Sequence, residues 1–108
     1  RVYLDLTGRI PTVSELLEFV GDSEPQKREV LVERLLASPA YARHMQYTFD
    51  VMFMERLPKK HVPPEEFQTY LRKSFAENKP YNRLATEILT ADGSVPELRA
   101  ASRFLLDR

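Results

Sequence analysis

The chain has 108 residues, enough for one domain, and its 43% apolar and 30% charged residues are typical of a globular protein. Its 16 basic and 16 acidic residues cancel, so it lacks the basic excess that nucleic-acid binding usually requires. The absence of cysteine excludes a disulfide framework, a Cys-ligated zinc site and covalent haem attachment within these residues. No apolar stretch approaches the ~20 residues of a membrane span.

The first residues, R-V-Y-L-D-L-T-G, suit either a strand or the end of a helix. A lone strand would leave its backbone groups without partners, so we favour a helix that ends at Gly8. The sequence opens on this phrase and ends on the apolar run A-S-R-F-L-L-D-R, with no helix-ending residue after it. We therefore expect a domain cut from a longer protein and truncated at both ends.

Two helices follow, each introduced by a pattern typical of a capping box. In Thr12-Val13-Ser14-Glu15, the Thr12 hydroxyl and the Glu15 carboxylate can each accept from the other residue's amide. The first helix then has one apolar face and a glycine for a left-handed end: Val13, Leu16, Leu17, Val20 and Gly21. A second box at residues 23–26 predicts a helix that ends near Ala37.

Ser38 and Pro39 predict the start of a central helix over residues 39–57, with serine as cap and proline in the first turn. Apolar residues occupy most of its circumference, as in a helix at the centre of a small domain. They are Tyr41, Met45, Phe49, Val51, Met52, Phe53 and Leu57. The methionines invite comparison with axial haem ligands, but thioethers on such a stripe are ordinary core residues.

Three more helical segments are predicted after the central helix. One starts at Pro64 and buries Phe67, Tyr70, Leu71, Ser74 and Phe75. Asn78-Lys79-Pro80 interrupts the pattern, a short helix around residues 84–89 follows, and a third box at residues 94–97 opens the last. The sequence thus predicts an all-α fold: a single domain over residues 1–108, built as a compact bundle of about five or six short helices.

Candidate chemistry is sparse. His44 and Asp50 are six residues apart on one helix, about 600° of rotation, so they cannot form a local dyad. The only other histidine is His61, so we predict no metal site, and we predict no cofactor in this chain. A pair of facing carboxylates would instead indicate glycoside hydrolysis. The acids to test for it are Asp50, Glu55, Glu65 and Glu66.

Three phrases together resemble a domain of unknown function found in large planctomycete-type proteins beside cytochrome c domains. They are Y-L-D-L-T-G-R-I-P-T at residues 3–12, L-L-A-S-P-A-Y at 35–41 and F-A-E-N-K-P-Y-N-R-L at 75–84. The resemblance implies an exported or envelope-facing protein with a c-type cytochrome module further along. Many members place tryptophan where this chain has Met45 and Phe49, and Asp50 is out of register with the family's acid.

Our hypothesis from the sequence is a non-catalytic helical scaffold or docking module of a larger exported, cytochrome-associated protein. Its expected partners are neighbouring domains of the same chain, with neither nucleic acid nor membrane insertion. The predicted interface is the apolar side of the central helix, represented by Tyr47, Phe53 and Leu57. The alternative is part of a hydrolase that acts on envelope polysaccharides, with its main site partly outside these residues.

Overall fold

The computed structural model describes residues 1–108 as helices joined by short connections, without a strand, which confirms the all-α prediction. Six of the eight helical segments have seven residues or more. The segments are α1 (Val2–Thr7), α2 (Val13–Gly21), α3 (Lys27–Leu36), α4 (Pro39–Met54), α5 (Pro64–Ala76), α6 (Tyr81–Thr90), the 3₁₀-helix η1 (Pro96–Ser102) and α7 (Arg103–Asp107).

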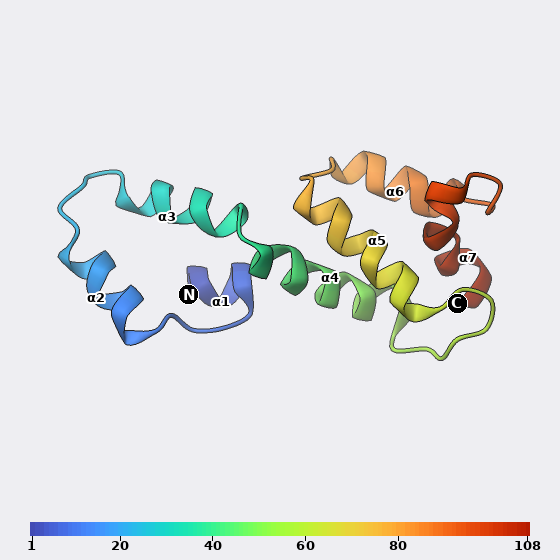
Figure 1. Cartoon of the computed structure of the whole chain (residues 1–108), viewed down its shortest axis with the longest axis horizontal. Helices are drawn as coiled ribbons and strands as arrows, with labels where there is room; N and C mark the ends of the chain where they lie inside the picture. The colour runs from blue at the N-terminus through green and yellow to red at the C-terminus, as the bar shows by residue number, and fades with distance from the viewer.

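The helices form two clusters along an axis of 53 Å, against 24 and 17 Å in the other directions. Helices α1 to α3 occupy one end, α5 to α7 the other, and α4 runs between them (Figure 1). The larger core consists of Met54, Phe67, Tyr70, Leu71, Leu84, Ile88, Ala91 and Ala101. The smaller core has three buried residues, Tyr3, Leu31 and Leu35, with Leu6 and Phe19 packed against them.

Several predicted helix ends are confirmed. Gly8 ends α1 in the left-handed conformation with φ of 74°. In the Thr12 capping box, the Glu15 amide donates to Thr12 Oγ1 at 3.2 Å and the Thr12 amide donates to Glu15 Oε1 at 3.0 Å. Ser38 caps α4 by accepting from the Tyr41 amide at 3.3 Å. These local signals are therefore sufficient to position α1, α2 and α4.

Three predicted caps are wrong. Gly21 is the last residue of α2 and the chain continues through Asp22 in an extended conformation, so no left-handed end forms. At residues 23–26 the Asp22 side chain accepts from the Glu24 amide at 2.9 Å, and this turn replaces the predicted box. Asp92 does the same for the Ser94 amide at 2.9 Å, and the segment after it is a 3₁₀-helix without a side-chain cap.

The central helix is shorter than predicted, because it ends at Met54 and not at residue 57. Glu55 and Arg56 both adopt left-handed backbone conformations, with φ of 49° and 61°, and stop the helix. Such conformations are costly for residues with side chains and are concentrated where surrounding structure imposes them. The prediction that Met52 packs in the core is also wrong: Met54 is 1% exposed, whereas Met52 is 55% exposed.

Candidate functional site

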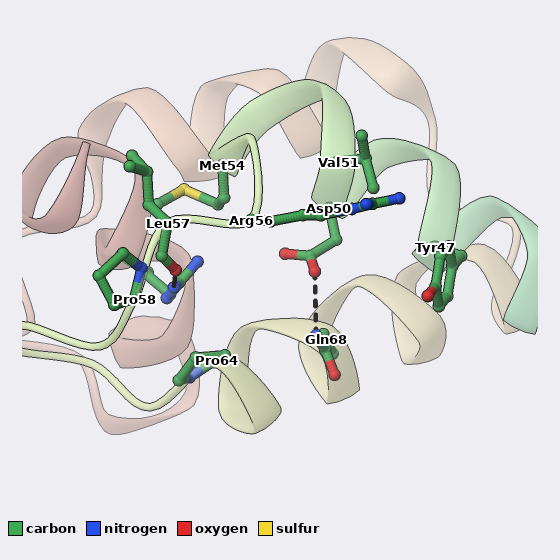
Figure 2. Close-up of a pocket in the computed structure, with 10 residues that line it drawn as sticks. Tyr47, Asp50, Val51, Met54, Arg56, Leu57, Pro58, Pro64 and Gln68 are labelled. Atoms are coloured by element: carbon green, nitrogen blue, oxygen red, sulfur yellow. Dashed lines mark hydrogen bonds between the residues drawn. The ribbon is translucent and has the colours of Figure 1, made fainter.

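A pocket of about 360 Å³ lies where the end of α4 meets the following loop and the start of α5. Figure 2 shows the side chains that surround it. Helix α4 contributes Tyr47, Asp50, Val51 and Met54; the loop contributes Arg56, Leu57 and Pro58; Pro64, Gln68 and Arg103 complete the lining. Apolar walls with a few convergent polar groups are the usual composition of a ligand site.

Asp50 is the only carboxylate in this lining. Its Oδ2 accepts a hydrogen bond from Gln68 Nε2 at 2.9 Å, whereas its Oδ1 is buried without any hydrogen-bond partner. In Figure 2 the unbonded oxygen points away from Gln68, toward the Leu57 side of the pocket. A buried polar atom without a partner is rare in native proteins and requires a specific explanation.

Arg103 and Asp107 hold the loop that forms one wall of the pocket. Arg103 is 1% exposed, and it donates from Nη2 to the Leu57 carbonyl at 2.9 Å and from Nε to the Val62 carbonyl at 3.2 Å. Asp107 is fully buried and accepts from the amides of His61 at 2.9 Å and Val62 at 3.0 Å. The two side chains, both from α7, thus hold the loop at its start, Leu57, and near its end, at His61 and Val62.

The environment of Asp107 alters its acidity. Burial alone would raise its pKa, but the hydrogen bonds from Val62 and His61 outweigh burial and lower the pKa of Asp107 to about 2. A carboxylate that accepts several backbone hydrogen bonds is stabilised in its charged form. Asp107 therefore serves as an ionised structural anchor at neutral pH.

The predicted interface residues lie in different surroundings. Tyr47 is 64% exposed at the rim of the pocket, and Leu57 is half-buried in the pocket wall. Phe53 is half-buried elsewhere, with ring centroids 5.6 Å from Phe49 and 5.7 Å from Phe104. The structure therefore brings Tyr47 and Leu57 to one pocket and places Phe53 outside it.

The other candidate side chains are separate from one another. His44 packs against Gly8, where an added Cβ would lie 2.6 Å from His44 Nδ1, and His61 lies 2.9 Å from Asp107. Glu55 pairs with Arg108 at 2.7 Å, and Glu65 and Glu66 are exposed in the first turn of α5. The structure contains no cluster of three potential metal ligands.

A buried polar network lies between α5 and α6 and was not predicted. Glu87 Oε2 accepts from the Tyr70 hydroxyl at 2.7 Å and from Lys79 Nζ at 2.6 Å. Burial, together with the hydrogen bond to Glu87, raises the pKa of Tyr70. Burial alone would raise the pKa of Glu87, but hydrogen bonds from Lys79 and Tyr70 outweigh burial and lower it. Every member has a partner, so the network is structural.

The phrase at residues 75–84 creates this network. Asn78 is left-handed with φ of 52°, its amide donates to the Phe75 carbonyl at 3.1 Å, and the Lys79 amide donates to the Ser74 carbonyl at 2.9 Å. This pair of bonds is the Schellman arrangement that ends a helix. It directs Lys79 back toward Glu87. The sequence signal was the Asn-Lys-Pro turn, but nothing in the sequence around Glu87, eight residues after Lys79, marks it as the partner.

A further apolar surface lies on α2. Helix α2 buries none of its residues, although its apolar residues share one face. We name Val13, Leu16, Leu17 and Val20 the α2 apolar face; these side chains are 50% to 73% exposed. The sequence correctly identified the shared face of α2, but the face has no partner within this structure.

Comparison of the sequence with known protein families shows to which family this chain belongs. Residues 1–108 match the family PSCyt2, whose description is "Protein of unknown function (DUF1549)". The chain belongs to this family. The resemblance carried by the three phrases is thus confirmed, and the family name agrees with the expected link to cytochromes. No curated protein and no solved structure matches the chain. None of its helices combines the length and apolarity that crossing a membrane requires.

Proposed function

We propose that this chain is a non-catalytic helical docking module of a larger exported, cytochrome-associated protein. The observation that carries the proposal is the α2 apolar face. Val13 is 73% exposed, Leu17 64% and Val20 67%. Such a face on an amphipathic helix is normally the one that packs against a neighbour. In this chain the neighbour is a surface outside residues 1–108.

The attachment of α2 to the rest of the chain is slight. Phe19 alone of its residues packs against the smaller core. Lys27 Nζ donates to the Phe19 carbonyl at 3.0 Å and to the Asp22 carbonyl at 3.2 Å, and lies 4.6 Å from the centre of the Phe19 ring. These contacts fix the end of α2 and leave its apolar face free for docking.

The total exposed surface also supports a docking role. The chain exposes 7555 Å², whereas a folded monomer of 12.6 kDa is expected to expose about 6,200 Å². The radius of gyration is 16.8 Å, against roughly 13 Å for a typical domain of this length. The excess is the surface that a partner would cover.

The occupant of the face is a neighbouring domain of the same polypeptide. The face contains four side chains, far fewer than the roughly 20–30 residues a side of a stable interface between free proteins. A tethered partner has a high effective concentration and needs much less contact area. The family name supports a cytochrome-bearing neighbour and, with it, an exported location.

The groups with altered acidity support a non-catalytic role. Asp107 anchors a loop, and Glu87 and Tyr70 belong to a network in which each member is paired. Catalytic groups need a free face toward a substrate as well as an altered pKa. The Asp50 pocket has no second carboxylate in its lining, so it lacks the pair that glycoside hydrolysis uses.

Photo-crosslinking from position 17 tests the proposal. A photoreactive amino acid replaces Leu17 in the intact protein, and crosslinked peptides are identified by mass spectrometry. We expect crosslinks to another domain of the same polypeptide. The matched control is Leu89, which is 59% exposed at the other end of the structure, and it should give no such product. Crosslinks from position 17 only to a second copy, or to nothing, would contradict the proposal.

A further inference from the structure

Tyr47 stands between two pockets of different chemistry. It contributes to the pocket of about 360 Å³ that contains Asp50 and to a second pocket of about 400 Å³ beside α1. Its side chain is 64% exposed. Its hydroxyl makes no hydrogen bond within the chain, whereas the hydroxyls of Tyr3 and Tyr70 each make one. An exposed aromatic ring with a free hydroxyl is available to a ligand that extends across both pockets.

The second pocket is cationic. Its lining comprises Thr7, Gly8, Arg9, Ala40, Arg43, His44 and Tyr47, and contains no carboxylate. Neither Arg9 nor Arg43 forms an ion pair, although the charge of Arg9 acts on the nearby Glu15 carboxylate and helps to lower its pKa. Gly8 permits the close approach of α1 to His44 that joins these groups. Two unpaired guanidinium groups and a histidine suit an anionic group.

The Asp50 pocket, in contrast, contains a hydrogen-bond acceptor that has no donor. The buried Oδ1 of Asp50 lacks a donor, and Gln68 has its amide nitrogen committed to Oδ2 of the same carboxylate. The wall beside it consists of Val51, Leu57, Pro58 and Pro64. Arg56 completes the rim and is placed there by its left-handed backbone. A ligand that provides hydroxyl donors and an apolar edge would complete this pocket.

We propose that the two pockets and Tyr47 together bind an acidic saccharide. Its carboxylate or sulfate lies against Arg9, Arg43 and His44, and its ring packs on Tyr47. The Asp50 carboxylate turns on binding, so that Oδ1, which is buried in the free chain, accepts from a hydroxyl of the next sugar. A saccharide has these three features in one molecule: an anionic group, hydroxyl donors and a C–H face for an aromatic ring. The site goes beyond docking, because it involves α4 and not the α2 apolar face.

Other anionic ligands fit less well. A free phosphate or sulfate would satisfy the cationic pocket but leave Tyr47 and Asp50 unused. A nucleic acid would bring its next phosphate toward the Asp50 carboxylate, and the chain has no net positive charge to favour it. An acidic peptide has fewer hydroxyl donors for Asp50, and it serves as a competitor in the test.

NMR titration of the backbone amides tests the proposal. The probes are digalacturonate, a sulfated heparin disaccharide, cellobiose, triglutamate and a short oligothymidylate. We expect digalacturonate or the heparin disaccharide to shift the amides around Tyr47, Asp50 and Gln68 in a saturable manner; which of them does so distinguishes carboxylate from sulfate. Cellobiose should bind more weakly than the acidic disaccharide by at least about tenfold, because it lacks the negative charge. Equal binding of cellobiose, triglutamate or oligothymidylate, or no saturable shift, would overturn the proposal.

Two substitutions locate the site, each with a matched control. Tyr47→Ala and Arg43→Ala should each weaken binding of the acidic disaccharide roughly tenfold. Both side chains are exposed, so the fold should be unchanged by circular dichroism. Tyr81→Ala removes another tyrosine of 64% exposure, and Arg99→Ala removes another exposed arginine without an ion pair; neither should alter binding. Wild-type affinity in both Tyr47→Ala and Arg43→Ala would refute the assigned site.

Discussion

Oδ1 of Asp107 lies 2.9 Å from the backbone amide of His61 and 2.9 Å from its ring Nδ1, although the two residues are 46 positions apart. This contact joins the end of the chain to the loop between α4 and α5. Together with the bonds from Arg103, it holds the wall of the Asp50 pocket. The shape of the pocket therefore depends on α7, which is only five residues long.

Removal of the Asp107 carboxylate should destabilise the chain. Asp107→Ala leaves the amides of His61 and Val62 without their acceptor and should lower the free energy of unfolding by about 2–4 kcal/mol. Urea denaturation followed by circular dichroism measures the change. Asp5→Ala, which removes an exposed carboxylate paired with Arg1, should have little effect. Equal stability of the two variants would show that Asp107 is not an anchor.

The same carboxylate should make stability depend on pH in the acid range. The pKa of Asp107 falls from its ordinary 3.8 to about 2 in the folded chain. The unfolded chain therefore binds the proton more readily, so the stabilisation is complete above about pH 4 and is lost as the pH falls toward 2. Urea midpoints measured over this range should fall steeply for the wild type and less steeply for Asp107→Asn. Parallel curves would contradict the assignment.

Gly8→Ala should destabilise the chain through two separate effects. The left-handed φ of 74° is unfavourable for alanine, and the new Cβ would lie 2.6 Å from His44 Nδ1. We expect a loss of about 1–3 kcal/mol in the free energy of unfolding. In the Gly8→Ala/His44→Ala double variant the steric part should be relieved, so the combined loss should be smaller than the sum of the single losses. Strict additivity would exclude the contact.

The fold could be predicted from the sequence wherever a signal was local. The Thr12 box, the Ser38-Pro39 start and the Gly8 end depend on residues within one turn, and each is confirmed. The boxes at 23–26 and 94–97 failed because a neighbouring aspartate, Asp22 or Asp92, formed the competing hydrogen bond. A capping pattern alone does not show which of several nearby side chains accepts the hydrogen bond from the backbone amide.

The site was harder to predict because its contacts join distant segments. Tyr47 and Leu57 were named from the sequence and line one pocket, but Arg103 and Gln68 were not, since nothing near them indicates a partner across the chain. Likewise Lys79 and Glu87 meet only because of the turn at Asn78. The apolar pattern of α2 was visible, but burial depends on the amount of surface that the remaining helices supply.

Lys79→Met should destabilise the chain, because it removes the donor closest to Glu87. Both side chains are nearly buried, at 11% and 12% exposure, and the change leaves the Glu87 carboxylate with fewer partners. The expected loss is about 1–3 kcal/mol in the free energy of unfolding. The matched control is Lys73→Met, which removes an exposed lysine 4.0 Å from Glu77 and should change stability little. Indistinguishable midpoints would show that the network contributes nothing measurable.

The chain should carry no haem of its own. It has no cysteine for covalent attachment, and Met54 is buried in the larger core while Met52 lies on the surface. An absorbance spectrum of the purified chain should therefore show no haem band, before or after incubation with haemin and removal of the excess. A stoichiometric band that depends on Met45 or His44 would contradict this prediction.

Hydrogen exchange of the α2 amides in the intact protein tests the docking proposal most directly. In residues 1–108 alone, α2 has few contacts and its amides should exchange much faster than those of α5, whose inner face is buried. In the intact protein, a domain seated on the α2 apolar face should slow exchange in Val13–Gly21 while leaving α5 unchanged. Equally fast exchange of α2 in both proteins would show that nothing covers this face and would contradict the proposed function.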